Sequence, residues 1–431
     1  MHILLIGFGS RGDVQPLLAL GCGLQDAGYR VSIASSLNFR ALIEDAGLTF
    51  APIRTDMQAL MTGEHGQQWI ESGNNYLKQA QSMRRMIAEA GEAVGQDLLN
   101  AAHDADVLVS GLSSFGVADA IAQKFNKQHV TVLLAPMNPT RFHAATMQPS
   151  IPRKNIALNR FAGYVGQYFT HWIFKPVTDQ FRASLGLESL RFGGFARAYN
   201  QRVPVLYGLS PLVMPRAEDW GAHIHVTGYW FYDAPNDWQP SDDLSRFLQA
   251  GEPPVYIGFG SMSATDPEGT AHMMLEALQQ SGQRGIIHSG WANFTADQLP
   301  DTVYLLDYAP HDWLFPQMAA VIHHGGAGTT AAALRAGVPN SVVAHMADQP
   351  YWGRRVHELG VGAPYVQRTK LNPQRLATMI RETVSDAGMR ERAASLGQQI
   401  RQENGVERAV DILGTIVKSG PVAASRPEST R

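Results

Sequence analysis

A buried strand, a glycine-rich turn and a helix of small residues are predicted by the stretch Val321-Ile322-His323-His324-Gly325-Gly326-Ala327-Gly328-Thr329-Thr330-Ala331-Ala332. Gly326 and Gly328 would expose backbone N–H groups at the start of the helix, where unpaired donors and the helix dipole stabilise a phosphate. His324 and a hydroxyl of Thr329 or Thr330 are further donors to phosphate oxygens. The stretch therefore predicts a phosphate-binding loop.

A second polar cluster follows the next predicted strand, residues 341–344. Asp348 and Gln349 come after this strand, so we expect them at the same edge of the sheet as the phosphate-binding loop. A carboxylate beside an amide can bind several sugar hydroxyls. The alternative role for Asp348 is to cap the helix that begins near Pro350.

Strands alternate with helices in both halves of the chain. The predicted strands are 3–8, 31–34, 107–110 and 130–134 in the first half and 255–258, 286–289, 303–306, 320–323 and 341–344 in the second. A proline-rich, acidic stretch, 236–253, separates the halves. This pattern predicts an α/β fold with two Rossmann-like domains facing each other across a cleft.

Composition excludes several classes of protein. The 431 residues are 45% hydrophobic and 17% charged, and their net charge of −3 offers no field to attract nucleic acid. The single cysteine, Cys22, excludes an internal disulfide. Because we find no signal peptide and no membrane-spanning run, we expect a cytoplasmic protein.

The turn Gly7-Phe8-Gly9-Ser10-Arg11-Gly12 fits the pattern of a dinucleotide-binding loop. The acidic residue expected at the end of the second strand is replaced by Ser35 and Ser36. An NADP-dependent oxidoreductase that uses Arg40 therefore remains only a distant alternative.

Two motifs resemble metal-binding sites but are better explained without a metal ion. Asp104-Ala105-Asp106 precedes a strand and is interpreted as a connection, and the adjacent His323 and His324 lack further ligands at metal-site spacing. We expect no metal and no cofactor.

The run from His323 to Gly362, which includes Asp348-Gln349-Pro350-Tyr351-Trp352-Gly353, resembles the donor signature of the family 1 glycosyltransferases. It is most similar to the branch with the sterol 3-beta-glucosyltransferases and the glycopeptide and macrolide glycosyltransferases. Residues 9–16, 228–231, 255–262 and 310–315 agree with that branch. The similarity covers nearly the whole chain to about Gly414, apart from insertions at 56–102 and 141–187.

The resemblance implies the two-domain GT-B fold. We expect an acceptor-binding domain over 1–235, a linker over 236–253 and a nucleotide-sugar-binding domain over 254–402. A helix over 403–417 would return to the first domain, and 418–431 would be a disordered tail.

The resemblance also implies how a nucleotide-sugar is held. The pyrophosphate would be bound by His324, the backbone of Gly326 and Gly328 and the Thr329 hydroxyl, with Ser261 assisting from a facing loop. Asp348 and Gln349 would bind the sugar.

The nucleoside would lie near Trp291 and Tyr308. Ala332 stands where plant relatives carry a ribose-binding glutamate. This difference leaves the choice between uridine and deoxythymidine donors open.

Asp13 follows the first strand and precedes a helix that we expect to begin near Pro16. The resemblance places a catalytic base at this position, and the helix N-terminus should keep the carboxylate ionised and weakly basic. The alternative is a carboxylate that only stabilises its helix. No partner carboxylate can be assigned.

Together these features predict an inverting, metal-independent transferase that moves a sugar, glucose first, from a UDP-sugar to a hydroxyl of a sterol, lipid, polyketide or other apolar acceptor. The alternatives are a transferase that uses a thymidine-diphosphate deoxysugar and, more distantly, a non-catalytic partner protein.

Acceptor-binding residues are expected within 56–102 and 137–187 without further assignment. The aromatic cluster Tyr164–Phe174 is interpreted as packing in the acceptor domain, and its basic flanks keep a peripheral membrane contact as an alternative.

Overall fold

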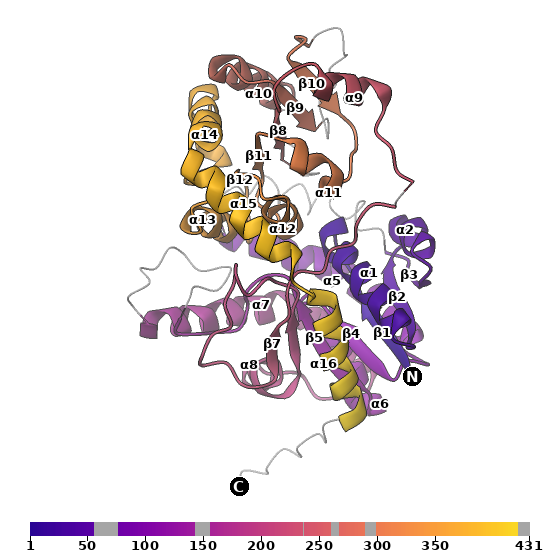
Figure 1. Cartoon of the computed structure of the whole chain (residues 1–431). Coiled ribbons are helices and arrows are strands. Elements are labelled where there is room, and N and C mark those ends of the chain that lie inside the picture. The colour runs from indigo at the N-terminus through magenta and orange to yellow at the C-terminus, as the bar shows by residue number, and fades with distance from the viewer. Residues whose placement is uncertain (56–75, 143–155, 236, 260–266, 289–298, 421–431) are drawn as a thin grey trace. The chain divides into compact units, whose positions relative to one another are not determined.

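The computed structural model describes residues 1–55, 76–142, 156–235, 237–259, 267–288 and 299–420 (Figure 1). These residues form two compact units. Unit 1 comprises Met1–Tyr232 and Asn404–Arg431, and unit 2 comprises Asp233–Glu403. Each unit has its own parallel sheet and its own hydrophobic core.

Unit 1 is built on a parallel sheet with the strand order β3-β2-β1-β4-β5-β6-β7. Its strands are β1 (His2–Ile6), β2 (Arg30–Ser36), β3 (Thr49–Ile53), β4 (Val107–Ser110), β5 (Gln128–Leu133), β6 (Val205–Tyr207) and β7 (Ile224–Val226). Its α-helices are α1 (Arg11–Asp26), α2 (Arg40–Asp45), α5 (Tyr76–Ala101), α6 (Phe115–Phe125), α7 (Ile156–Ser184), α8 (Phe192–Arg197) and α16 (Gly405–Ser419).

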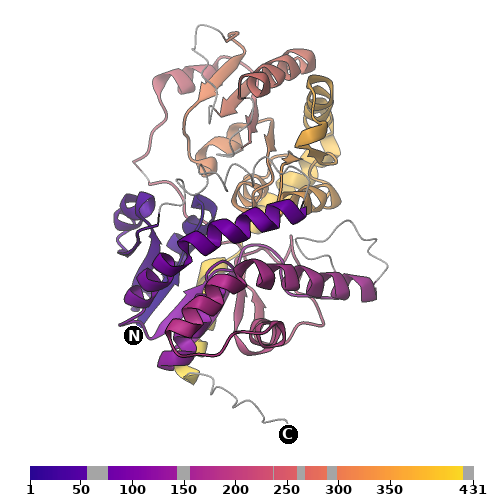
Figure 2. The ribbon, with the colours of Figure 1, turned by 180° about the vertical axis from the view of Figure 1, so that it is seen from behind.

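Alternation along β1 divides the core of unit 1 into two layers. Ile3 and Leu5 point to the face covered by α1 and α16, and Leu4 and Ile6 point to the face covered by α5, α6 and α7. Figures 1 and 2 show these two helical layers from opposite sides. Leu413 of α16 is fully buried in the first layer, so the C-terminal helix completes the core of the N-terminal unit.

Unit 2 has a second parallel sheet, with the order β10-β9-β8-β11-β12-β13. Its strands are β8 (Val255–Gly258), β9 (Gly285–His288), β10 (Val303–Leu306), β11 (Ala320–His323), β12 (Asn340–Ala344) and β13 (Val366–Gln367). Its α-helices are α9 (Asp242–Gln249), α10 (Pro267–Ser281), α11 (His311–Leu314), α12 (Ala327–Ala336), α13 (Gln349–Glu358), α14 (Pro373–Ser385) and α15 (Ala387–Arg401).

Several elements differ from the sequence-based expectation. The strands β3, β6, β7 and β13 were not predicted. Strands β6, β7 and β13 have only two or three residues, and Pro52 interrupts the run of β3. The stretch expected as a linker contains α9, whose Leu244 is buried in the core of unit 2. Helix α16 continues to Ser419, and residues 421–431 lie outside the described part.

Helix α1 begins at Arg11, five residues before Pro16, so Asp13 lies within its first turn rather than ahead of it. The helix can start there because the Asp13 carboxylate accepts hydrogen bonds from Ser10 at its N-terminus. Pro16 then costs the helix one backbone hydrogen bond.

Each sheet has one point where the strand order reverses. In unit 1 the chain leaves β1 towards β2 on one side and returns as β4 on the other, and in unit 2 the same happens between β8 and β11. Loops at the carboxyl ends of such strands diverge and leave room for a ligand. The turn before Asp13 follows β1 and the glycine turn follows β11, so both predicted sites lie at these positions.

Candidate functional site

The first part of the candidate site is the carboxylate of Asp13. Its Oδ2 accepts hydrogen bonds from the backbone N–H of Ser10 at 2.7 Å and from the Ser10 hydroxyl at 3.0 Å. Oδ1 accepts none from the described residues, and the side chain is exposed. Ser10 therefore orients the group through one of its two oxygens.

Gly9 makes this arrangement possible. It has a φ of +150°, and a Cβ atom at this position would lie 2.4 Å from Oδ2 of Asp13. A larger residue would displace the carboxylate. The glycine thus has a steric purpose that depends on Asp13.

The pKa of Asp13 is raised above its ordinary value of 3.8, because surrounding protein atoms desolvate the carboxylate more than the two hydrogen bonds from Ser10 stabilise its charge. The exposure of the side chain limits this shift. The direction is nevertheless opposite to the weakly basic carboxylate expected from the helix N-terminus alone, and it makes Asp13 a better proton acceptor.

Two serines outside this turn hold its backbone in place. The hydroxyl of Ser35 donates to the carbonyl of Gly7 at 2.7 Å, and Ser113 donates to the carbonyl of Phe8 at 3.3 Å. Because Ser35 is buried and the N-terminus of α1 is already filled by the Asp13 carboxylate, the geometry does not favour a dinucleotide at this loop.

The second part of the site is the glycine turn between β11 and α12. The backbone N–H of Gly325 donates to Nδ1 of His323 at 3.1 Å, and Nε2 of His323 is 3.2 Å from Oδ1 of Asn340. The ring of His323 is fully buried, and burial lowers its pKa to about 3. The neutral ring therefore holds its proton on Nε2 and fixes the turn through Nδ1.

Neither Gly325 nor Gly326 has room for a Cβ atom in this turn. Gly325 has a φ of +88°, and a Cβ atom there would lie 2.6 Å from Val342. A Cβ atom on Gly326 would lie 2.5 Å from Nε2 of His324. The His324 ring thus folds over the backbone that opens the helix.

His324 is neutral as well. Burial lowers its pKa to about 4, and the backbone of Gly258 opposes this shift. A neutral imidazole has one N–H, so His324 would act as a hydrogen-bond donor rather than as a cation, and the ring would have to turn this N–H from the backbone of Gly258 to a phosphate oxygen.

Gly328 and Thr329 lie in the first turn of α12, and both are accessible. A Cβ atom on Gly328 would meet nothing within 4 Å, so no contact in the protein requires glycine there. The hydroxyl of Thr330 is buried and donates to the carbonyl of Gly326 at 2.9 Å. Of the two threonines, Thr329 is the one left to face a ligand.

Asp348 and Gln349 lie beside this turn, because β12 neighbours β11. Oδ2 of Asp348 accepts from the indole N–H of the buried Trp352 at 2.7 Å, and its backbone caps α13. Oε1 of Gln349 accepts from the backbone N–H groups of His345 and Met346 at 2.7 and 3.0 Å. Gln349 thus holds its own loop, and sugar binding by the two residues stays a prediction.

Tyr308 follows β10, three strands away from β11 in the sheet. At about 4.8 Å per strand this separates the two loops by about 14 Å, enough for a ribose between a diphosphate and a base. The ring is 52% exposed, which argues against core packing. Ser261 and Trp291 lie outside the described residues.

The residues that hold the two parts of the site in place were not identified from the sequence. The partner of Asp13 is Ser10, and the pattern Ser10-Arg11-Gly12-Asp13 is a recognisable helix-capping signal. His323 and Asn340 could not be identified, because their contact joins two neighbouring strands.

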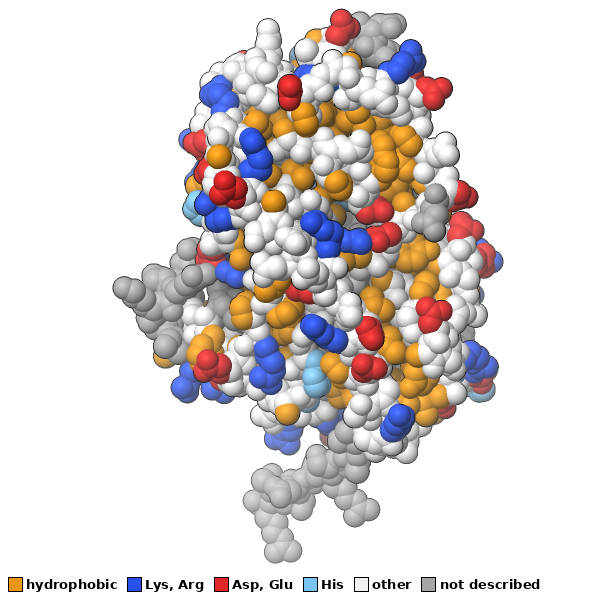
Figure 3. Space-filling model, viewed as in Figure 1, with side chains coloured by type: hydrophobic (Ala, Val, Ile, Leu, Met, Phe, Trp, Pro, Cys, Tyr) orange, Lys and Arg blue, Asp and Glu red, His pale blue; other side chains and the backbone are white. Residues whose placement is uncertain are grey.

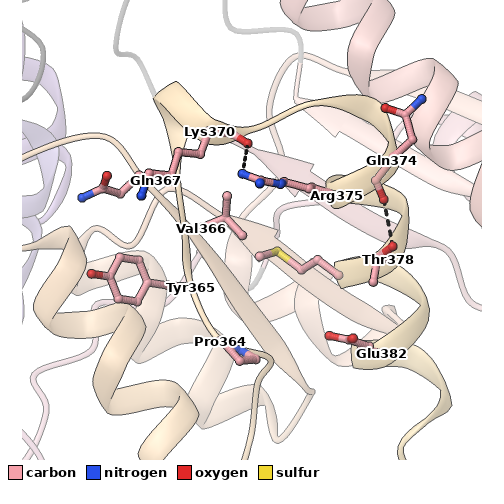
Figure 4. Close-up of a pocket in the computed structure, with 10 residues that line it drawn as sticks. Pro364, Tyr365, Val366, Gln367, Lys370, Gln374, Arg375, Thr378 and Glu382 are labelled. Carbon is pink, nitrogen blue, oxygen red and sulfur yellow. Dashed lines mark hydrogen bonds between the residues drawn. The ribbon is translucent and has the colours of Figure 1, made fainter.

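Other features of the described residues lie apart from these loops. A hollow of about 660 Å³ lies between β13 and α14 and is lined by residues such as Tyr365, Lys370 and Arg375, with none of the described candidate residues among them (Figure 4). Asp106 accepts from the backbone N–H of His2 before β4, as expected of a connection. In the described part of the chain, no group of three His, Cys, Asp or Glu could hold a metal ion, and no helix is long and apolar enough to cross a bilayer.

Charge is mixed on the surface. On the face seen in Figure 3, Lys and Arg side chains are interspersed with Asp and Glu. This agrees with the small net charge of −3.

Two family models match the chain. The glycosyltransferase family 28 N-terminal domain matches residues 3–110, and the C-terminal domain of erythromycin biosynthesis protein CIII-like proteins matches residues 274–410. These ranges include Asp13 and the glycine turn, respectively.

The chain is similar to sterol 3-beta-glucosyltransferases along nearly its whole length. It is 33% identical over 425 residues to one from Arabidopsis thaliana, covering 95% of this chain and 67% of the plant protein. It is 32% identical over 459 residues to one from Aspergillus terreus, covering 100% of this chain and 31% of the fungal protein. The chain thus spans about two thirds of the plant relative and about a third of the fungal one.

Solved structures share the fold. The glycotransferase of kitacinnamycin matches with a TM-score of 0.72 and 17% identity over 96% of this chain and 99% of its own. The calicheamicin glycosyltransferase matches with a TM-score of 0.68 and 18% identity over 98% and 99%. The two parallel-sheet units therefore have the GT-B architecture that the sequence predicts.

Alanine at positions 326 and 328 should separate a structural glycine from one kept for a ligand. We expect Gly326→Ala to displace the His324 ring and lower the melting temperature of the full chain. Gly328→Ala should keep or raise it, because alanine favours a helix by about 1 kcal/mol over glycine. Thermal unfolding measures both, and an equal loss of stability in the two variants would contradict the assignment.

Proposed function

Because the chain belongs to the family of the sterol 3-beta-glucosyltransferases, we propose that it transfers glucose from UDP-glucose to a hydroxyl of an apolar acceptor, such as a sterol, lipid or polyketide. The transfer would invert the anomeric carbon and need no metal. The observation that carries this proposal is the first turn of α12. Among the described residues its first N–H groups have no partner, it carries no acidic residue, and its Gly328 is accessible and not required by the protein itself.

Unit 2 supplies the charge stabilisation that departure of a nucleoside diphosphate requires. The negative charge that develops on the leaving phosphate would be met by the N–H groups at the start of α12, by the neutral His324 and by the Thr329 hydroxyl. Asp348 and Gln349 would bind the sugar, and Tyr308 would pack against the nucleoside. Ser261 and Trp291 keep their proposed roles at the phosphate and the nucleoside.

Unit 1 supplies the base. The acceptor oxygen attacks the anomeric carbon, its proton passes to Asp13, and the bond between that carbon and the diphosphate oxygen breaks. The raised pKa makes Asp13 a stronger base than an ordinary aspartate, and the hydrogen bonds from Ser10 keep it oriented. These contacts support catalysis by Asp13 alone, without a second carboxylate.

Apolar acceptors such as sterols and lipids are abundant in membranes. We therefore propose that the protein works from the cytoplasm in peripheral contact with a membrane.

The donor site is tested by calorimetric titration of the full chain with UDP, with thymidine diphosphate as competitor and a metal chelator present. His324→Ala should weaken UDP binding by roughly 10- to 150-fold, the value of one hydrogen bond to a charged group. His324→Gln should retain most of the affinity, because a neutral donor is kept.

The matched control is His272→Ala, which removes an exposed histidine from α10. Equal UDP affinity in His324→Ala and the control would refute the phosphate-binding role. Tighter binding of thymidine diphosphate than of UDP would favour the deoxysugar donor instead.

Asp13→Asn should lower kcat by roughly 10²- to 10⁴-fold, because the amide cannot accept the proton. In the wild type, kcat/KM should fall as pH decreases through the pKa of Asp13, since protonation removes the base. This fall in kcat/KM should occur at a higher pH than the pKa of an ordinary aspartate would give.

Asp26→Asn is the control, because Asp26 is an exposed carboxylate at the far end of the same helix. A normal kcat in Asp13→Asn, with the protein folded, would show that Asp13 only caps α1.

A further inference from the structure

The first half of α7 exposes apolar side chains and buries polar ones. Six apolar side chains on this half and just before it are 39–64% exposed: Phe142, Leu158, Phe161, Val165, Tyr168 and Phe169. At about 100° per residue, the five on the helix fall within an arc of about 100°. A helix on the surface of a soluble protein normally turns such an arc inward.

The opposite side of this half packs against the rest of unit 1, and its side chains are polar or small. Asn159 and Gln167 are buried, and Gln167 exchanges hydrogen bonds with the side chain of Asn200 at 2.8 and 2.9 Å. A Cβ atom on Gly163 would lie 2.9 Å from Pro139, so the helix is held close to the protein there. The orientation of the helix is therefore fixed by specific contacts, and its apolar side is turned outward by them.

The second half of α7 has the usual polarity and anchors the helix. Val177 and Phe181 are buried, and they pack where Gly91 and Gly95 of α5 leave room. In Figures 1 and 2 this half lies beside α5, whereas the first half projects beyond the sheet of unit 1. The outward apolar arc thus belongs to a rigid, well-anchored element.

The charge around this arc is basic. No Asp or Glu occurs between Ala120 and Thr178, although the chain has 38 of them. Arg141 and Arg160 are exposed next to the arc, and Arg191 precedes Phe192, whose ring is 5.3 Å from that of Tyr168. The nearby carboxylate of Asp219 accepts from the Thr140 hydroxyl and from the backbone N–H of Arg141.

We propose that the first half of α7 docks the protein onto an anionic lipid bilayer, with its apolar arc among the acyl chains and its arginines at the lipid phosphates. Aromatic rings and arginines are the residues that a bilayer interface favours. The inference deepens the proposed function, since a protein docked in this way would take an apolar acceptor directly from the membrane.

A bilayer fits this surface better than a protein partner. A stable protein interface uses about 20–30 residues on each side, whereas the arc offers five apolar side chains along about 17 Å of helix, with Phe142 just before it. A narrow apolar stripe with basic edges matches the interfacial helices of peripheral membrane proteins.

Co-sedimentation of the full chain with vesicles tests the docking. Wild-type protein should bind vesicles of phosphatidylcholine with about one third phosphatidylglycerol at least tenfold better than phosphatidylcholine alone, and salt should weaken this binding. The double variant Phe161→Ser, Phe169→Ser should bind the anionic vesicles roughly tenfold less well. Phe125→Ser is the matched control, because Phe125 is 48% exposed on α6 of the same unit.

An unchanged melting temperature and unchanged UDP binding would show that the double variant is folded. Wild-type protein that stays in the supernatant, or a double variant that binds like the wild type, would overturn the proposal. So would a wild-type dimer in ultracentrifugation that the double variant abolishes while neither protein binds vesicles. The vesicle assay contains no donor or acceptor, so a failure of the proposed function would appear in the UDP titration and not here.

Discussion

The hydrogen bond from the backbone N–H of Gly325 to the buried Nδ1 of His323 is the contact on which the donor half depends. It holds Gly325 at a positive φ, and that conformation turns the chain from β11 into α12. Within the described part of the chain, the turn leaves the first N–H groups of the helix without partners, at the point where the strand order of the sheet reverses. The neutral His324 then closes over Gly326. The predicted phosphate contacts of His324, Gly326, Gly328 and Thr329 follow from this one bend of the backbone.

The two units use the same local geometry for opposite purposes. In both, a buried parallel strand runs through a glycine turn into a helix at the reversal point of its sheet. The N-terminus of α1 is occupied by a carboxylate from its own chain, Asp13, which Ser10 orients. The N-terminus of α12 has no acidic residue in its first turn and is available to an anion from outside. In the proposed function the first site would supply a base and the second would accept the leaving group, which are the two requirements of glycosyl transfer.

Much of this could be predicted from the sequence, because the decisive elements are local. The strand, the glycine turn and α12 are contiguous, and the structure has β11 at the predicted residues. What could not be predicted depends on contacts between distant residues. Examples are the support of His323 by Asn340 from the next strand, and the outward turn of the apolar side of α7, which Asn200 and Pro139 determine. The start of α1 was misplaced because Pro16 outweighed the capping signal of Ser10 and Asp13.

We propose above that this chain moves glucose from UDP-glucose onto an apolar alcohol with inversion. The most direct measurement is mass spectrometry and NMR of the product formed by the full chain from UDP-glucose and a sterol in detergent. We expect a hexosylated sterol with a β-glycosidic bond, opposite to the α linkage of the donor. An α-linked product, or release of free glucose without any glycoside by a protein that binds UDP, would contradict it.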